Sequence, residues 1–148
     1  MRRADEVAER ISRALRPGGR FVAEFGGKGN LKLIHEAIYR ATEALGCPAG
    51  EEMSRYFPSI GEYAGLLERH RLTPNYAVLF DRLTPLEDGD DGMRHWVAMF
   101  ASDFVARLAT AQREPFLRNV EDQLRPALYR DGAWFADYRR IRIVAIRE

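Results

Sequence analysis

The sequence of 148 residues is short of several residue types on which common sites depend. Its one cysteine, Cys47, excludes an intrachain disulfide and a zinc site built from several thiolates. We favour an inert loop thiol over a nucleophile at this position. The three histidines, His35, His70 and His95, show no H-x-x-x-H spacing, so we expect no metal site shared between them.

The sequence also lacks a large excess of charge of one sign, and it lacks long apolar runs. The net charge is +1, which argues against a nucleic-acid partner or a polyacidic one. Lysine occurs only at Lys28 and Lys32, and we interpret the wealth of arginine mainly as a composition bias. No apolar run is long enough to span a membrane and no signal peptide opens the sequence, so we expect no membrane partner and a cytoplasmic location.

What the sequence does contain is a regular alternation of hydrophobic patterns. The spacing of apolar residues predicts helices and strands in turn. The helices are expected at 4–15, 31–45, within 57–70 after the cap at Ser59, at 93–111 and at 115–128; the strands are expected at 20–25, at 76–83 and within 134–147, centred on 141–146. This alternation predicts one α/β domain, residues 1–148, with a mostly parallel sheet of about three strands.

Local signals mark some ends of these elements. Ser59 and Glu62 form a capping box at the start of a helix, and Asn30 is placed to cap the helix that follows it. Pro115 suits the first turn of another helix. The stretch from Arg130 to Gly132 is typical of a turn.

A glycine-rich loop, "GGKGN", follows the first strand from Gly26 to Asn30. It matches neither G-x-x-x-x-G-K-[ST] nor G-x-G-x-x-G, because Gly29 follows Lys28 where the first motif needs a hydroxyl. A phosphate site at the start of the next helix stays physically possible. We favour a loop that faces a ligand, because open α/β sheets bind ligands at the carboxyl ends of their strands.

Glu24 is a carboxylate inside an apolar strand, and it must face solvent, a partner or a site. Both the structural and the site interpretation stay open for it. Trp96 and Phe100 are spaced to share one helix face, either in the core or as a lid over a ligand.

The stretch "DYRRIRI" places three arginines in the last strand. Alternation directs Arg140 and Arg142 to one face and Arg139 to the other. Solvated arginines are the simpler interpretation, and recognition of an anion by one of them is the alternative.

Four stretches carry a resemblance to a known family. They are "ALRPGGRFVAEFGGKGNL", "FPSIGEYAGLLERHRLTP", "DRLTPLEDGDDGMRHWVAMF" and "LRPALYRDGAWFADYRRIRIVA". In order and spacing they resemble the C-terminal part of class I S-adenosylmethionine-dependent methyltransferases of the trans-aconitate methyltransferase-like group. The resemblance implies part of a Rossmann-like sheet with an antiparallel last strand, flanking helices and a helical insertion before that strand. It also implies a small-molecule substrate.

The family's glycine-rich E/D-x-G-x-G-x-G loop and the acidic residue that holds the ribose have no counterpart in this sequence. The resemblance therefore implies the C-terminal half of a methyltransferase, with the cofactor-binding half absent. We expect such a chain to bind S-adenosylmethionine weakly and to be inactive alone. A non-catalytic binding module and one half of a split enzyme are the alternatives.

By the same resemblance, the substrate wall is formed by the loop after the first strand and by the helical insertion. The substrate-binding candidates are Glu24, Asn30, Trp96 and Phe100. No catalytic side chain and no metal is expected. In the family the strand at 20–25 has neighbours on both sides, so without its partner it becomes a sheet edge, and we expect a homodimer through that edge.

Overall fold

The computed structural model describes residues 2–47 and 56–148. The chain has the predicted α/β fold with flanking helices, and the strand pairings that the structure gives are antiparallel. Its contacts form two compact units. Unit 1 comprises Met1–Asn30, Arg55–Arg82 and Arg139–Glu148, and unit 2 comprises Leu31–Ser54 and Leu83–Tyr138.

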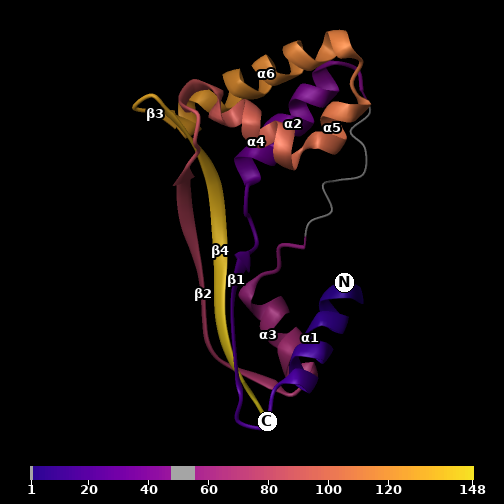
Figure 1. Cartoon of the computed structure of the whole chain (residues 1–148), viewed down its shortest axis with the longest axis vertical. Coiled ribbons are helices and arrows are strands. Elements are labelled where there is room, and N and C mark those ends of the chain that lie inside the picture. The colour runs from indigo at the N-terminus through magenta and orange to yellow at the C-terminus, as the bar shows by residue number, and fades with distance from the viewer. Residues whose placement is uncertain (1, 48–55) are drawn as a thin grey trace. The chain divides into compact units, whose positions relative to one another are not determined.

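Unit 1 is built on a sheet in the order β1-β4-β2 (Figure 1). These strands are β1 (Arg20–Gly26), β2 (Leu72–Pro85) and β4 (Ala133–Arg147), the last two of which continue into unit 2. β1 pairs antiparallel with β4 from Arg20↔Ile146 to Gly26↔Arg140 without interruption. β4 is therefore central and β1 forms an edge of the sheet, as expected.

Helices α1 (Arg2–Ala14) and α3 (Ile60–Arg69) lie side by side next to this sheet in Figure 1. Alternate residues of the strands pack against them, because successive side chains of a strand point to opposite faces. This core contains a T-shaped pair between Phe25 and Tyr63, with ring centroids 4.7 Å apart. Its fully buried members are Leu67, Leu72, Ile141, Ile143 and Ala145.

The expectation of a mostly parallel sheet is wrong for the pairings that the structure gives. Both β1 and the short strand β3 (Tyr129–Arg130) pair antiparallel with β4. The alternation of strands with helices predicted parallel neighbours, but the last strand inserts between the earlier two instead of joining at their side. The antiparallel last strand that the resemblance implied is confirmed.

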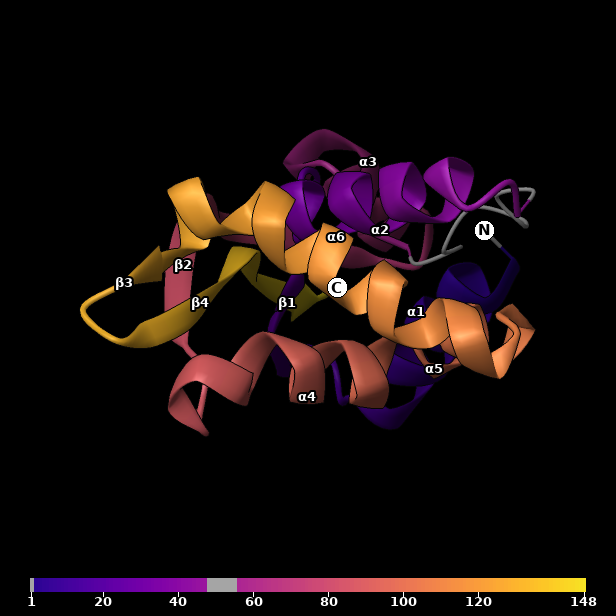
Figure 2. The same ribbon diagram turned by 90° about the horizontal axis from the view of Figure 1, so that it is seen from above.

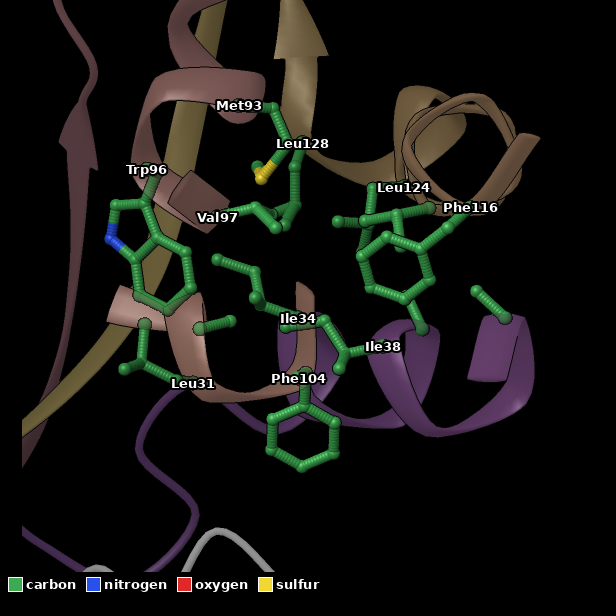
Figure 3. Packing of buried hydrophobic residues seen from close by; sticks show 14 of the residues in the cluster. Leu31, Ile34, Ile38, Met93, Trp96, Val97, Phe104, Phe116, Leu124 and Leu128 are labelled. Atoms are coloured by element: carbon green, nitrogen blue, oxygen red, sulfur yellow. The ribbon is translucent and has the colours of Figure 1, made fainter. Parts of the chain in front are cut away.

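Unit 2 is mainly helical. It contains α2 (Lys32–Ala44), a 3-10 turn (Gly89–Asp91), α4 (Gly92–Phe100), α5 (Ser102–Arg107) and α6 (Thr110–Leu128). Figure 2 shows α2 and α6 next to each other, in agreement with the contacts between them. Their apolar faces enclose a core of large side chains (Figure 3). Its fully buried members are Ile34, Ile38, Met93, Val97, Phe116, Val120 and Trp134.

Two helix predictions in unit 2 are wrong. The helix expected at 93–111 is interrupted at Ala101, whose φ of −122° and ψ of 23° are not helical. The interruption lets Phe104 return to the core, whereas Phe100 on the preceding helix stays 40% exposed. Pro115 lies inside α6 and not in its first turn, because the helix already begins at Thr110, where the Gln112 side chain accepts a hydrogen bond from the Ala109 amide.

Two local signals are confirmed, the capping box of α3 and the turn between β3 and β4. Ser59 and Glu62 form the capping box of α3, with Ser59 N to Glu62 Oε2 at 2.8 Å. Asp131 and Gly132, with φ of 53° and 76°, form the two-residue turn between β3 and β4. Positive φ at both central positions is the backbone that a tight hairpin requires.

Asn30 does not cap α2, so that prediction is wrong. The residue at the cap position is Leu31, in a left-handed conformation with φ 58°, and its side chain makes no cap hydrogen bond. The carboxylate of Asp137 on β4 takes that role instead, since its Oδ2 accepts the Leu33 amide at 2.7 Å. A capping group 104 residues away in the sequence leaves no local signal.

Candidate functional site

Packing restricts the side chain at two glycines of the stretch from Gly26 to Asn30. A Cβ on Gly26 would lie 2.6 Å from Cε1 of Phe57, and one on Gly27 would lie 2.5 Å from Cδ1 of Leu79. Real Cβ atoms do not approach other atoms so closely, so side chains at these positions would displace their neighbours. The glycine-rich composition of the loop thus has a structural cause that is independent of a ligand.

The amides of this loop are also engaged. Gly27 N donates to the Arg139 carbonyl, Lys28 N to the Pro58 carbonyl and Asn30 N to the Gly27 carbonyl, each at 2.9 Å. A phosphate cradle needs several backbone amides that point at the anion. Three amides of the loop donate to protein carbonyls, so the loop has the hydrogen bonding of a closed turn.

Asn30 fixes the end of this turn. It is 4% exposed, and its Oδ1 accepts the Arg139 amide at 2.8 Å. The side chain therefore ties the loop to β4 inside unit 1. Any contact of Asn30 with a substrate stays a prediction.

Glu24 lies where three arginines converge. Its Oε1 accepts from Nη1 of Arg82 at 2.6 Å, and its Oε2 accepts from Nε and Nη2 of Arg142 at 2.8 and 2.6 Å. Arg140 reaches the same carboxylate at 3.7 Å. Glu24 thus has protein partners, which is one of the three possibilities that the sequence left open. Its role in a site stays a prediction.

These contacts lower the pKa of Glu24. The hydrogen bond from Arg142 is the largest cause, and the charges of Arg142 and Arg82 act in the same direction against the cost of burial. Glu24 therefore stays ionised at neutral pH. It is suited to hold arginines in place and not to donate a proton.

In unit 2, Trp96 and Phe100 have different surroundings although they are neighbours. Their ring centroids are 5.1 Å apart. Trp96 is 4% exposed and donates its Nε1 hydrogen to the Tyr138 hydroxyl at 3.2 Å. Phe100 is 40% exposed, next to Met99 at 69%. Trp96 is a core residue in this structure, while Phe100 is accessible to a ligand.

The structure therefore brings together Trp96 and Phe100 in unit 2, and it places Glu24 and Asn30 near the glycine-rich loop in unit 1. Each pair is described within its own unit. The substrate-binding role of all four stays a prediction.

Sequence reasoning missed Asp137. Burial raises the pKa of this carboxyl, although the amides of Leu33 and Ile34 at the start of α2 act in the opposite direction. The sequence held a signal for it, because an acidic residue between Ala136 and Tyr138 in an apolar strand resembles the pattern that drew attention to Glu24.

Two further searches concern the described ranges 2–47 and 56–148. They contain no group of three or more histidine, cysteine, aspartate or glutamate side chains placed to hold a metal ion. Within the same ranges, the apolar stretches of the helices are too short for one of them to cross a membrane.

Comparison with known proteins relates the chain to methyltransferases. It is 34% identical, over 148 residues, to an uncharacterised methyltransferase of Schizosaccharomyces pombe, C70.08c. The match covers 96% of this chain and 55% of that protein, so the chain spans about half the length of the curated relative it matches. No family model matches the sequence.

Solved structures with a similar fold are more distant in sequence. The YcgJ protein of Bacillus subtilis is 14% identical with a TM-score of 0.49, and the match covers 97% of this chain and 57% of that one. Geranyl diphosphate C-methyltransferase of Streptomyces coelicolor, solved with geranyl diphosphate and S-adenosyl-L-homocysteine, is 18% identical with a TM-score of 0.39. That match covers 98% of this chain and 42% of the enzyme. Neither likeness identifies a ligand of this chain.

Proposed function

We propose that this chain supplies the C-terminal, substrate-side part of an S-adenosylmethionine-dependent methyltransferase that acts on a small molecule. The observation that carries the proposal is the 34% identity to the methyltransferase of S. pombe, which extends over 96% of this chain but 55% of that protein. The order and spacing of the four sequence stretches that resemble methyltransferases support it as well.

The second part of the proposal is that the chain alone does not bind the cofactor tightly. The printed sequence contains no E/D-x-G-x-G-x-G loop. The glycine-rich loop that it does contain directs the amides of Gly27, Lys28 and Asn30 to protein carbonyls. We therefore assign no step of methyl transfer to the described residues.

The proposed task of this chain is to position the methyl acceptor and to exclude water from it, two effects that need no nucleophilic side chain. We propose that Phe100 contacts the acceptor and that Trp96 supports Phe100 from the core, since their rings are in contact. Within unit 1, Asn30 and Glu24 would hold the glycine-rich loop and β1 in place.

We also propose that the isolated chain forms a homodimer through β1. This strand pairs with β4 on one side and is an edge of the sheet among the strands that the structure describes. No proline or bulge interrupts it, and Val22 at its middle is 58% exposed. An edge of this kind is a template for a second strand.

The proposal can be tested by complementation. The part of the S. pombe relative that this chain does not match would be co-expressed with this chain and assayed for release of S-adenosylhomocysteine with a panel of small acceptors. We expect turnover with both polypeptides together and none with either alone. The matched control is the relative's own corresponding segment in place of this chain.

Other outcomes would identify the chain as a self-sufficient enzyme, a non-catalytic binding module or one half of a split enzyme. Turnover by this chain alone would identify a self-sufficient enzyme and contradict the proposal. If the relative's two segments are active together but this chain cannot replace its counterpart, the chain is a non-catalytic binding module. A second polypeptide that copurifies with the chain and restores turnover would identify a split enzyme.

A further inference from the structure

The sheet of unit 1 has helices on one face and residues of a different character on the other. Odd-numbered residues of its strands, such as Phe25 and Ile143, pack in the core with α1 and α3. By alternation, the even-numbered residues of β1 and β4 point away from that core, as do those of β2 beside the core residues Ala77 and Leu79; Leu72, at the start of β2, is itself buried in the core. Val22 and Tyr76 among them are 58% and 50% exposed, so this second face, here named the open face, is accessible to a partner.

Arginines dominate the centre of the open face. Arg140 and Arg142 on β4 and Arg82 on β2 all reach Glu24 on β1. Arg139, the odd-numbered neighbour, pairs with Asp81 instead. The alternation that the sequence analysis predicted for the three arginines of β4 is therefore confirmed.

Arg140 is the member of this cluster with the longest contacts to Glu24. Arg82 and Arg142 occupy the two oxygens of the Glu24 carboxylate at 2.6–2.8 Å. Arg140 is left with a 3.7 Å approach to Oε1 and a 3.4 Å hydrogen bond from its Nη2 to the Glu24 backbone carbonyl. Its Nε is buried and has no hydrogen-bond partner in the part of the chain that the structure describes.

Among the described residues, this arrangement leaves Arg140 without a counterion of its own. The Arg140 side chain is 27% exposed, so water solvates its guanidinium incompletely. A partly buried cation with long contacts costs free energy that a well-placed carboxylate recovers, because the planar fork of arginine matches a carboxylate with two parallel hydrogen bonds. The net charge of +1 for the whole chain conceals this local excess.

We propose that the open face of unit 1 binds an acidic polypeptide segment, one carboxylate of which pairs with Arg140. A polypeptide is favoured over a free organic acid because exposed apolar groups, Val22 and Tyr76, lie on the same face as the arginines. Arginine and tyrosine beside apolar groups are typical of protein interfaces. The open face includes Glu24, which is also a candidate for substrate binding, but peptide binding to Arg140 does not depend on methyl transfer.

The test uses a capped peptide of alternating glutamate and valine residues, with acetate as the free-acid probe. Both are titrated calorimetrically into the full chain at low salt. We expect the peptide to bind, acetate to give no saturable heat at the same concentration, and Arg140→Gln to weaken peptide binding about tenfold. Arg139→Gln, the adjacent arginine on the same strand, is the matched control and should leave the affinity unchanged.

A second variant, Val22→Ser, keeps the arginines and removes apolar surface from the open face. Because Val22 is exposed, the variant is expected to fold, and it should weaken peptide binding about threefold. Circular dichroism melts establish that each variant is folded. Absence of peptide binding to the wild type, equal binding by the Arg140→Gln and Arg139→Gln variants, or saturable binding of acetate as tight as the peptide would each overturn the proposal.

Discussion

The two units of this chain bury their apolar surface in different ways. Unit 2 packs helices around large side chains such as Phe116 and Ile38, both fully buried (Figure 3). Unit 1 packs two helices against one face of a sheet, and its other face carries arginines that converge on Glu24 beside the exposed Val22 and Tyr76. The comparison indicates that unit 2 has the deeper core, whereas unit 1 carries surfaces that are suited to partners.

The strongest way to test the comparison is to truncate the two neighbouring aromatic residues of unit 2. Trp96→Ala removes a core side chain that is 4% exposed, and we expect a loss of about 3–5 kcal/mol in the free energy of unfolding. Phe100→Ala, at 40% exposure, is the matched control and should cost about 1 kcal/mol or less. Urea denaturation measures both. Equal losses would contradict the separation of a core residue from an accessible one.

Glycines of unit 1 provide the next test. In Gly27→Ala the new Cβ would meet Leu79 and Ile141, and we expect a loss of about 1–3 kcal/mol in stability. Gly65→Ala, in the interior of α3, meets nothing within 4 Å and should stabilise the chain by about 0.5–1 kcal/mol. Thermal melts compare the two. A neutral Gly27→Ala variant would show that the loop glycine is kept for a reason other than packing.

The exposed edge of unit 1 gives a prediction about association. Sedimentation equilibrium of the wild type should show a species of twice the 17.0 kDa chain mass. Val22→Pro removes a backbone donor from β1 and should shift the equilibrium to the monomer, while Val22→Thr should not. A monodisperse wild-type monomer at high micromolar concentration would show that the edge is protected.

The smallest expected effect contrasts two carboxylates. The pKa of Glu24 is lowered by its arginines, so its contribution to stability is present above its ordinary value of 4.5 and is lost as the pH falls. The pKa of Asp137 is raised by burial, so its contribution is present below the ordinary value of 3.8 and is lost as the pH rises through the raised pKa.

Substitution should therefore have opposite pH profiles in the two units. The destabilisation caused by Glu24→Gln is expected to disappear toward acidic pH. Asp137→Asn should gain stability relative to the wild type as the pH rises. Denaturation midpoints between pH 3 and pH 7, measured at constant ionic strength, compare the profiles, and parallel profiles would contradict the assigned surroundings.

Local signals predicted the elements of this fold better than they predicted its long-range contacts. The capping box at Ser59 and the turn at Gly132 depend on adjacent residues and were predicted correctly. The cap of α2 comes from Asp137, and the interruption at Ala101 depends on which side chains the core of unit 2 admits. Neither feature can be predicted from the residues adjacent to it in the sequence.

The same distinction applies to the candidate site. The position of Glu24 in an apolar strand left open whether it faces solvent, a partner or a site, and alternation placed Arg140 and Arg142 on one face without indicating that both reach Glu24. The helical spacing of Trp96 and Phe100 predicted a shared helix face, on which their rings are in contact, but not their different exposure. Exposure depends on the packing of the whole unit, which spacing along one helix does not contain.

The measurement that tests the central claim most directly is a calorimetric titration of S-adenosylmethionine into the isolated 148-residue chain. The few contacts that the described residues offer would have to offset the full entropic cost of ordering the ligand. We therefore expect no binding with a dissociation constant of about 10 μM or tighter, roughly −7 kcal/mol. Saturable binding in the micromolar range or tighter would contradict the claim that the cofactor site lies outside this chain.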